Sequence, residues 1–437
     1  MRPPTIRTLL ALILLAAAAH GEANDPRVGM KVVTKYRHPL KLGRRVVDRD
    51  EVFRVYTVEA ARDRSLWIVA GGVKGWVPAS AVVPFADALN FFTEEIRANP
   101  YKAAAYGNRG LIWAEKGEHE IALADYDESL RIDPTNPSIY CDRGNLRDRR
   151  GEHDRALADF NEAIRLDPNN ALAYNSRGCL WRKKQDYLHA IADFNEAIRH
   201  APDFAPAYQN RGLARADRNE HERAIADFDE AIRLAPATPG VLAGRGESRR
   251  IKKEYGRAIA DFNEAIRLDP NFEWAYAYRG LAREDRKEYD RAIADYDESI
   301  RLAPGVPWAY IRRARCWGQL KEYARALADF DEAIRLGPDD PAGHNARAWL
   351  RATCPDPRVR DGKKAVESAT RACELGSWKV ADYLDTLAAA LAEAGDFDAA
   401  DRRQQEAIDR VPAGADVPQV FRDRLALYRD RKPFRQP

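Results

Sequence analysis

The stretch Ala156-Leu-Ala-Asp-Phe-Asn-Glu-Ala-Ile-Arg-Leu-Asp-Pro168 decides the fold, because variants of it recur along the chain at a constant interval. Each variant ends on a proline, and the step from each proline to the next is the same. The prolines are Pro100, Pro134, Pro168, Pro202, Pro236, Pro270, Pro304 and Pro338, which gives a 34-residue period. Proline lacks a backbone N–H and cannot continue a helix, so each proline marks a helix end. A fixed period of this length predicts one array of stacked helical units, in place of the about three globular domains that 437 residues would otherwise suggest.

Other positions of the unit are also constant when the proline is numbered 32. Seven units then start at residues 103, 137, 171, 205, 239, 273 and 307 and fill residues 103–340. Position 8 is Gly or Ala, position 20 is Ala, position 24 is Phe or Tyr, and position 27 is Ala or Ser. Small residues let two antiparallel helices approach closely, and we expect the aromatic ring at position 24 to fill the wedge between successive hairpins. This pattern resembles the tetratricopeptide repeat. The resemblance implies a mainly α fold, a right-handed α-solenoid of hairpins that each contain a helix A and a helix B.

The repeat pattern extends beyond the seven units in both directions. Ala88, Phe92 and Pro100 occupy positions 20, 24 and 32, so residues 86–100 are predicted to be a connecting helix. Residues 341–378 read as an irregular eighth repeat with an inserted loop, and residues 381–414 as a ninth in which Gln404 replaces the aromatic residue. Residues 418–437 are predicted to form a C-terminal capping helix and tail, as the end of a solenoid requires.

Residues 1–23 are typical of a secretory signal peptide. Arg2 and Arg7 precede an apolar run over residues 9–19, and small residues offer cleavage after Ala19, Gly21 or Ala23. The run is too short to span a bilayer, which needs about 20 residues. A buried N-terminal helix is the alternative, but the run has no polar face. We therefore expect a periplasmic or secreted protein with no integral membrane span after signal removal.

Residues 27–85 are predicted to form β-structure. Apolar residues alternate with polar ones in short runs that Gly and Asp interrupt, which predicts a small barrel. Gly75, Trp76, Val77 and Pro78 resemble the last strands of Src-homology-3-like barrels, which implies a small N-terminal all-β domain of that family. Ala81 stands where the family has an aromatic residue that contacts proline-rich peptides, so the resemblance does not extend to that ligand.

Charge excludes one class of partner and leaves another open. The chain has 71 Lys and Arg against 68 Asp and Glu, which is too balanced for a nucleic-acid binder that works through phosphate contacts. Residues 27–85 nevertheless carry 12 basic and 5 acidic residues. This excess could attract an anionic cell-envelope polymer, or it could be an ordinary solvated surface, which is the interpretation that we favour.

Two further positions are constant in the seven units. Position 7 is Arg109, Arg143, Arg177, Arg211, Arg245, Arg279 and Arg313. Position 23 is Asp125, Asp159, Asp193, Asp227, Asp261, Asp295 and Asp329. A ladder of guanidiniums could grip a polyanion, but a carboxylate in every partner helix favours ion pairs within each repeat.

Catalytic and metal-binding patterns have simpler interpretations. Carboxylates such as Asp125, Asp127 and Glu128 lie on one continuous helix and recur with the repeat, which does not suit a calcium loop. His119 and its counterparts share position 17 with tyrosines, which indicates a packing site. No zinc spacing, nucleophile elbow or phosphate loop is present, so we expect no cofactor and no enzymatic activity. Cys141 and Cys179 lie in adjacent A helices, and we do not expect a bridge there.

The candidate binding face follows from the resemblance. In the family, positions 2, 5, 9 and 12 of the A helices line a concave groove, and here these positions vary between units. The candidate partner-binding residues are Asn145, Asn175, Arg182, Gln209, Glu247, Arg250, Trp274, Trp308 and Arg315. Trp274 and Trp308 share position 2 of neighbouring units and could form an aromatic platform or pack between hairpins. No Lys stands at position 5, so the family's clamp for acidic chaperone tails is not implied.

Two hypotheses of function result. The first is an exported, non-enzymatic scaffold that binds a protein or peptide in the groove of the repeats. The second is an envelope-binding module, in which the basic barrel attaches to an anionic wall polymer while the repeats present a partner.

Overall fold

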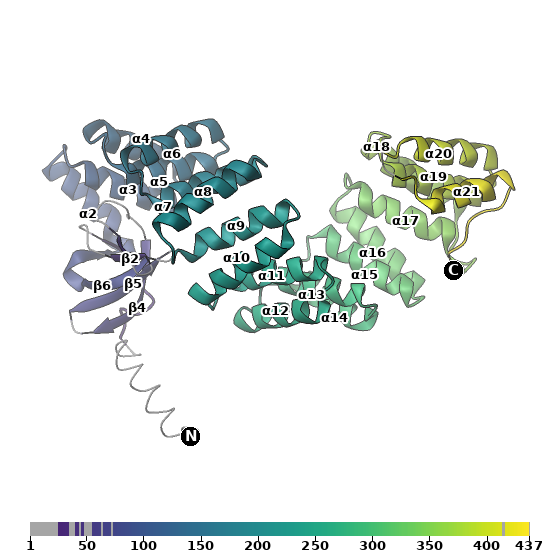
Figure 1. Cartoon of the computed structure of the whole chain (residues 1–437), viewed down its shortest axis with the longest axis horizontal. Helices are drawn as coiled ribbons and strands as arrows, with labels where there is room; N and C mark the ends of the chain where they lie inside the picture. Colours follow the sequence, from purple (N-terminus) through teal and green to yellow (C-terminus); the bar gives the residue numbers. More distant parts are fainter. Residues whose placement is uncertain are drawn as a thin grey trace, which may run out of the picture. The chain divides into compact units, whose positions relative to one another are not determined.

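The computed structural model describes residues 25–34, 40–42, 45–47, 55–62, 64–70, 73–412 and 416–436, coloured along the chain in Figure 1. The predicted signal peptide, residues 1–23, lies outside the described residues. The chain forms two compact units, Met1–Ala237 and Thr238–Pro437.

The first unit begins with an antiparallel sheet. Its seven strands in the described residues are β1 (Lys31–Thr34), β2 (Leu40–Leu42), β3 (Arg45–Val47), β4 (Val55–Arg62), β5 (Ser65–Ala70), β6 (Val73–Pro78) and β7 (Val82–Pro84). They are ordered β3-β2-β6-β5-β4-β1-β7. A 3₁₀ turn, η1 (Ala79–Ala81), joins β6 to β7. Alternate residues of β4 and β5 point to a shared core, in which Tyr56 and Ile68 are fully buried.

The sheet packs against the helices of the same unit in two places. One hydrophobic cluster contains Tyr56 and Val77 of the sheet together with Ala171 and Phe204 of the repeats. A second cluster joins Val33 to the first helices of the array through Phe92 and Ile112. The β-domain therefore shares its apolar core with the repeats that follow it.

The helices of the first unit begin with α2 (Phe85–Ala98) and continue as four hairpins (Figure 1). The hairpins are α3 (Ala103–Glu115) with α4 (His119–Ile132), α5 (Pro137–Arg149) with α6 (His153–Leu166), α7 (Ala171–Lys183) with α8 (Tyr187–His200), and α9 (Ala205–Asp217) with α10 (His221–Leu234). We number these hairpins as repeats one to four.

The second unit continues the series with repeats five to nine. They are α11 (Pro239–Ile251) with α12 (Tyr255–Leu268), α13 (Glu273–Asp285) with α14 (Tyr289–Leu302), α15 (Pro307–Gln319) with α16 (Tyr323–Leu336), α17 (Pro341–Thr353) with α18 (Gly362–Leu375), and α19 (Ala381–Glu393) with α20 (Phe397–Asp409). A last helix, α21 (Gln419–Arg429), follows. The observed architecture is thus mainly α, with helical hairpins stacked in sequence, as the constant proline interval predicted.

Close contact within a hairpin depends on the small residue at position 8, which is glycine in repeats one to six. A Cβ atom built on Gly178 would lie 2.7 Å from the ring of Phe194, which is closer than real Cβ contacts. Phe194 also belongs to one cluster with Ala214 of the next hairpin. The aromatic residue at position 24 therefore fills the space between hairpins, as expected, and it also rests on the glycine of its own hairpin.

The arginine at position 7 joins three elements at once. Nε and Nη2 of Arg177 donate to the two carboxylate oxygens of Asp193 at 2.8 and 2.6 Å. Its Nη1 donates to Oδ1 of Asn161 in the preceding hairpin at 2.7 Å, and its guanidinium lies over the ring of Tyr174. Each partner is 16 residues away, one after the arginine and one before it.

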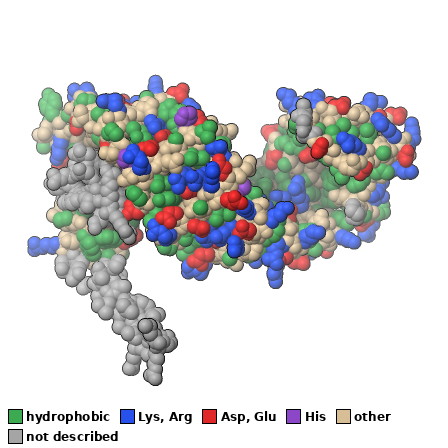
Figure 2. Space-filling view, in the orientation of Figure 1, with side chains coloured by type: hydrophobic (Ala, Val, Ile, Leu, Met, Phe, Trp, Pro, Cys, Tyr) green, Lys and Arg blue, Asp and Glu red, His purple; other side chains and the backbone are tan. Residues whose placement is uncertain are grey.

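The same pattern recurs in both units. We call the hydrogen bonds to the Asp 16 residues ahead the forward bond, and the hydrogen bond to the residue 16 places before the arginine the backward bond. Both are made by Arg143, Arg177, Arg211, Arg279 and Arg313. Arg109 and Arg245 also pair with the aspartate of their own repeat, so the ion-pair interpretation of the ladder is confirmed in all seven units. Figure 2 shows basic and acidic side chains interspersed over the visible face of the helices, as expected when charges are matched.

Repeat eight departs from this pattern. Arg347 keeps its backward bond to Asp331 at 2.6 Å. In the forward direction its Nη2 donates to Oγ of Ser368, 21 residues ahead, at 3.0 Å. The inserted loop accounts for the longer separation, because Ser368 stands at position 23 when Ala365 is placed at position 20. A serine hydroxyl thus accepts where repeats one to seven have a carboxylate.

The C-terminal segment closes the array with polar contacts. Gln404, which replaces the aromatic residue in repeat nine, is fully buried and donates to Oδ1 of Asp385 at 2.9 Å. Asp385 also pairs with Arg424 of α21, whose guanidinium lies 4.5 Å from the centre of the Trp349 ring. α21 is therefore held against repeats eight and nine.

Three general properties bear on function. Within the described segments, every helix is too short or too polar to cross a lipid bilayer. None of the five cysteines, Cys141 and Cys179 included, is joined to another in a disulfide bond. Among the same described residues, no cluster of His, Cys, Asp or Glu could hold a metal ion.

Candidate functional site

The candidate face is formed by the A helices. In the first unit α5 contacts α7 and α7 contacts α9, and in the second unit α13 contacts α15 and α15 contacts α17. The A helices of each unit therefore form one layer. We call the side of this layer that carries positions 2, 5, 9 and 12 the A-helix face. The predicted binding residues lie on it in both units.

In the first unit, two predicted residues have partners on the neighbouring A helix. Nδ2 of Asn210 donates to Oδ1 of Asn175 at 3.0 Å. Nε of Arg182 donates to Oδ2 of Asp217 at 2.6 Å, and both side chains are about one-third exposed. Asn145 and Gln209 are half-buried. This part of the face presents amides and a charge that is already matched.

In the second unit, Arg250 lies between two carboxylates. It donates to Glu247 at 2.8 and 2.9 Å and to Asp285 of the next A helix at 2.5 Å. The hydrogen bonds to Glu247 are the largest cause of its raised pKa. Sequence reasoning found Glu247 and Arg250 but missed Asp285 and Asp217, which both occupy position 13. An acidic residue one place after position 12 was the available signal.

The two predicted tryptophans are in different situations. Trp274 is 47% exposed and stacks on Tyr278, with ring centres 6.0 Å apart. Trp308 is half-buried, packs edge-on against Tyr296, and is covered by the guanidinium of Arg312. The two tryptophan rings thus pack against different neighbours and do not form a shared platform. Trp274 alone of this pair offers an open aromatic surface.

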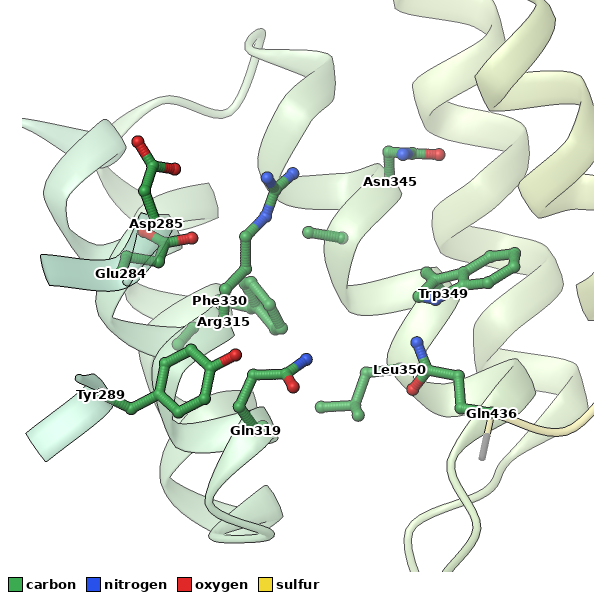
Figure 3. A pocket seen from close by; sticks show the side chains of 13 residues that line it. Glu284, Asp285, Tyr289, Arg315, Gln319, Phe330, Asn345, Trp349, Leu350 and Gln436 are labelled. Carbon is green, nitrogen blue, oxygen red and sulfur yellow. The ribbon is translucent and has the colours of Figure 1, made fainter. Parts of the chain in front are cut away.

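Arg315 lies in a cavity of about 500 Å³ on the A-helix face of the second unit. Figure 3 shows its side chain extending from α15 between two walls. Glu284 and Asp285 of α13 stand on one side, and Asn345 and Trp349 of α17 stand on the other. The remaining lining residues are Tyr289, Ala314, Gly318, Gln319, Phe330, Ala346, Leu350 and Gln436.

The charges around the cavity are unequally matched. Glu284 accepts hydrogen bonds from the hydroxyl of Tyr296 at 2.8 Å and from Arg312 at 3.3 Å. Asp285 is paired with Arg250. Arg315 has no hydrogen bond or ion pair to the described residues. Desolvation, followed by repulsion from Arg312, lowers the pKa of Arg315 from its usual value.

The C-terminal tail supplies one edge of the cavity. The backbone N–H of Gln436 donates to the carbonyl of Thr353 at 2.9 Å. The ring of Phe434 lies 5.8 Å from that of Trp349, and Arg435 pairs with Glu393 at 2.5 Å. These contacts fix Gln436 at the cavity although it lies far from α17 along the chain.

Sequence reasoning missed most of this cavity. Asn345 and Trp349 occupy positions 5 and 9 of repeat eight, so the rule that gave Arg315 would have found them if applied to that repeat. Gln319 and Glu284 are at positions 13 and 12. No sequence pattern placed Gln436 at the cavity, because its position depends on how the C-terminal tail folds back.

The described residues of this face present groups for non-covalent contacts. What the face offers is an exposed aromatic ring, several amides and the unpaired guanidinium of Arg315. Such groups recognise polar and acidic segments of other molecules.

Stacked helical hairpins of this kind define the class of α-solenoid proteins. Family models of the tetratricopeptide repeat match residues 110–147, 137–170, 209–273, 245–307, 285–350 and 380–410, which together make up more than half of the chain. The chain therefore belongs to the tetratricopeptide-repeat family. The models match no residue before Gly110, so the Src-homology-3-like assignment of the β-domain stays a prediction.

Solved structures agree with this fold. The Cut9–Hcn1 hetero-tetramer of the APC/C matches with a TM-score of 0.50 at 17% identity over 69% of this chain and 58% of that one. A tetratricopeptide repeat protein from Parabacteroides merdae matches at 0.46 and 20% identity, over 54% of this chain and 93% of that chain. YrrB, described as having an unusual peptide-binding site, matches at 0.35 and 20% identity, over 41% and 92%. No curated protein sequence matches the chain.

Proposed function

We propose that this protein is a non-enzymatic scaffold that binds a protein or peptide segment on its A-helix face. The observation that carries the proposal is that each repeat contains two groups of positions, one constant and one variable. Positions 7, 8, 20, 23 and 24 keep the same type of residue and make the same contacts in successive hairpins. Positions 2, 5, 9 and 12 differ from repeat to repeat. Residues such as Asn175, Trp274 and Arg315 at these positions are at least partly exposed, whereas position 5 is buried where it is small or apolar, as in Ala243 and Ile311. Side chains that vary where packing does not constrain them suit recognition.

The chemistry of the face supports binding through several modest contacts. Trp274 supplies an open aromatic surface, and Asn145 and Gln209 supply amides with both donors and acceptors. Arg182 and Arg250 are held in place by carboxylates, so they present charges without the entropic cost of ordering a free side chain. Within each unit, a segment with polar or aromatic side chains matches the groups that the unit presents.

A combined variant tests this proposal. Asn145→Ala, Gln209→Ala and Trp274→Ala remove groups from the A-helix face that make no hydrogen bond or ion pair to the described residues. Cross-linking mass spectrometry on the exported fraction should place partner cross-links on the A helices, and the variant should capture that same partner at least about tenfold less. The matched control is Ile121→Ala with Leu188→Ala, which removes exposed apolar side chains from the B helices α4 and α8. Cross-links confined to the B helices, or equal capture by both variants, would contradict the proposal.

We also propose that the protein is exported through residues 1–23. The positively charged start, the short apolar run and the small residues after it support this route. Cell fractionation of the full chain, compared with a variant that lacks residues 2–23, tests it. The full chain should reach the periplasm or medium in a shortened form, and the variant should stay in the cytoplasm.

The envelope-binding alternative has one supporting observation beyond charge. Trp67 and Trp76 lie 5.7 Å apart on β5 and β6, and Trp76 is 40% exposed. An aromatic pair on a basic domain suits a polymer that contains both sugar rings and negatively charged groups. Because the β-domain shares a core with the repeats, the test uses the whole chain. Sedimentation with isolated envelope should fall with rising salt and with Trp76→Ala, and salt-independent binding would dismiss this alternative.

A further inference from the structure

We propose that the C-terminal tail, residues 432–436, is an internal occupant that closes the A-helix face of repeats eight and nine, so that a partner reaches this part of the face only after the tail has left it. The inference rests on the proposed function and adds to it a means of regulation. It concerns the second unit alone.

The first step is the place of the tail, which lies on the A-helix face. After α21 the chain turns at Arg431, whose φ is 55°, and runs back to repeat eight. The ring of Phe434 lies 5.8 Å from that of Trp349, which occupies position 9 of repeat eight. The backbone N–H of Gln436 donates to the carbonyl oxygen of Thr353 at 2.9 Å, where α17 ends. Figure 3 shows Gln436 on the same side of the cavity as Trp349. The tail thus covers a side chain at one of the positions that the proposed function assigns to partners.

The second step is that Arg435 makes a contact that position 12 makes elsewhere. In repeats three and five, the arginine at position 12 pairs with an acid at position 13 of the next A helix, as Arg250 does with Asp285. Repeat eight has Ala352 at position 12, so this position supplies no cation to Glu393, which is position 13 of repeat nine. Nη2 of Arg435 lies 2.5 Å from a carboxylate oxygen of Glu393, and its Nη1 lies 3.5 Å from the carbonyl oxygen of Ala352. The tail therefore provides from outside the repeats a contact that belongs to the A-helix face.

The third step is that the tail is less deeply buried than the helix before it. α21 buries Phe421, Leu425 and Tyr428, whereas each side chain of residues 432–436 is exposed or half-buried. Terminal segments with little buried surface open at a low free-energy cost. The tail can therefore detach while α21 stays on repeats eight and nine.

The fourth step is that the groups under the tail keep other partners when it leaves. Glu393 also accepts from Nε of Arg360 at 3.0 Å. The ring of Trp349 keeps the guanidinium of Arg424, which lies 4.5 Å from its centre. Opening thus avoids the large cost of an unpaired buried charge. The open state presents Trp349 and the edge of the cavity of about 500 Å³ to other molecules.

The experiment supplies the tail as a separate molecule. The probe is the acetylated peptide Asp430-Arg-Lys-Pro-Phe-Arg-Gln-Pro437, titrated into the full chain and into the full-length double variant Phe434→Ala with Arg435→Ala. Binding is followed by ¹⁹F NMR of 5-fluorotryptophan, and the Trp349 resonance is assigned by its loss in Trp349→Phe. We expect the double variant to bind the probe with saturation and the unmodified chain to bind it at least about tenfold more weakly. The reason is that a tethered occupant competes at an effective concentration of about 1 mM.

Three controls complete the test. Arg429→Ala removes an exposed ion pair of α21 with Asp401 and should bind the probe as weakly as the unmodified chain. A probe with alanine at both substituted places should leave the Trp349 resonance of the double variant unshifted. A chain that ends at Arg431 should bind the probe as the double variant does, which covers the case that the two alanines disturb repeat eight.

Two results would overturn the inference. One is equal binding of the probe by the unmodified chain, the double variant and the shortened chain. The other is a lack of saturation in both altered chains up to about 5 mM probe, because an occupant that closes the face must bind more tightly than its own effective concentration. If partner cross-links still map to the A-helix face in either case, the role of the tail is dismissed while the proposed function stands.

Discussion

Two faces of α15 place the same side chain in opposite environments. Arg313 donates to Asp329 at 2.7 Å and to Asp297 at 2.6 Å, and it lies over the ring of Tyr310. Arg315, further along the helix, has no partner among the described residues and extends into a cavity. Their pKa values shift in opposite directions, because hydrogen bonds to carboxylates stabilise the charge of Arg313 and desolvation opposes the charge of Arg315.

The difference shows that position in the repeat, more than residue type, decides what an arginine does here. Position 7 faces the partner helix and the preceding hairpin, where one acceptor lies on either side of the arginine in the sequence. Position 9 faces outward from the A helices, where only another molecule or a neighbouring A helix can supply an acceptor. We call the side of an A helix that carries position 7 the paired face and the side that carries position 9 the open face. The two faces should respond differently to substitution.

The largest expected effect is on the paired face. Asp329→Ala removes the carboxylate that neutralises Arg313 and leaves a largely buried guanidinium with only its backward bond. We expect the free energy of unfolding to fall by about 3 kcal/mol. Urea denaturation measures the loss, and hydrogen exchange should locate it in α15 and α16.

The control for this variant lies one turn further along the same helix. Glu332 pairs with Arg335 at 2.6 Å, but both side chains are solvated. Glu332→Ala should leave the unfolding midpoint nearly unchanged, since surface pairs contribute little. Equal losses from Asp329→Ala and Glu332→Ala would show that the ladder is no more than a set of surface pairs.

A smaller effect should separate glycines of the two faces. A Cβ atom on Gly280 would lie 2.8 Å from the ring of Tyr296, whereas one on Gly318, which lines the cavity, would meet nothing within 4 Å. Gly280→Val should lower stability by about 2 kcal/mol through overpacking. Gly318→Ala should raise it by about 0.5 kcal/mol, because alanine favours the helix. Thermal melts followed by circular dichroism measure both, and a loss from Gly318→Ala would mean that the cavity wall is packed.

The smallest effect concerns the turn at the end of α15, which serves neither face. Lys321 has a φ of 64°, in the left-handed region that costs a residue with a Cβ atom. Lys321→Gly should therefore raise stability by about 0.5 kcal/mol. The reverse change at the same position of repeat two, Gly151→Ala, should lower it by about 1 kcal/mol. Opposite signs in the two denaturation midpoints would confirm a strained turn, and equal signs would contradict it.

The paired face could be predicted from the sequence and most of the cavity could not. The ladder is local: Arg177 and Asp193 keep the same separation as their counterparts in other repeats, so their pairing follows once the hairpin is recognised. The open face was found in part, because Arg315, Trp274 and Glu247 occupy positions that the repeat register points outward. What register does not give is the pairing between neighbouring A helices, such as Arg250 with Asp285, since it depends on how two side chains bend toward each other.

The cavity depends on contacts that the repeat period of the sequence does not predict. Its edge is formed by Gln436, which reaches Thr353 only because α21 and the tail turn back against repeat eight. Trp308 is a similar case in the opposite direction. Its position left two outcomes open, an aromatic platform or packing between hairpins, and the contacts with Arg312 and with Tyr296 of the preceding hairpin show the second. Irregular and tertiary contacts of this kind override what a repeat register predicts.

The symmetry of the ladder limits how such a chain can change in length. An arginine such as Arg177 uses one acceptor 16 residues ahead and one 16 residues behind, so a whole repeat can be duplicated or removed with all of these bonds reformed at the new junction. An insertion inside a hairpin instead changes the separation between the arginine and its forward acceptor. Repeat eight shows the result, because the forward bond of Arg347 spans 21 residues and ends on the hydroxyl of Ser368, while its backward bond persists. Engineered versions of this scaffold should therefore be lengthened in complete modules, and new loops should be placed in the last repeats, where no later ladder bond depends on them.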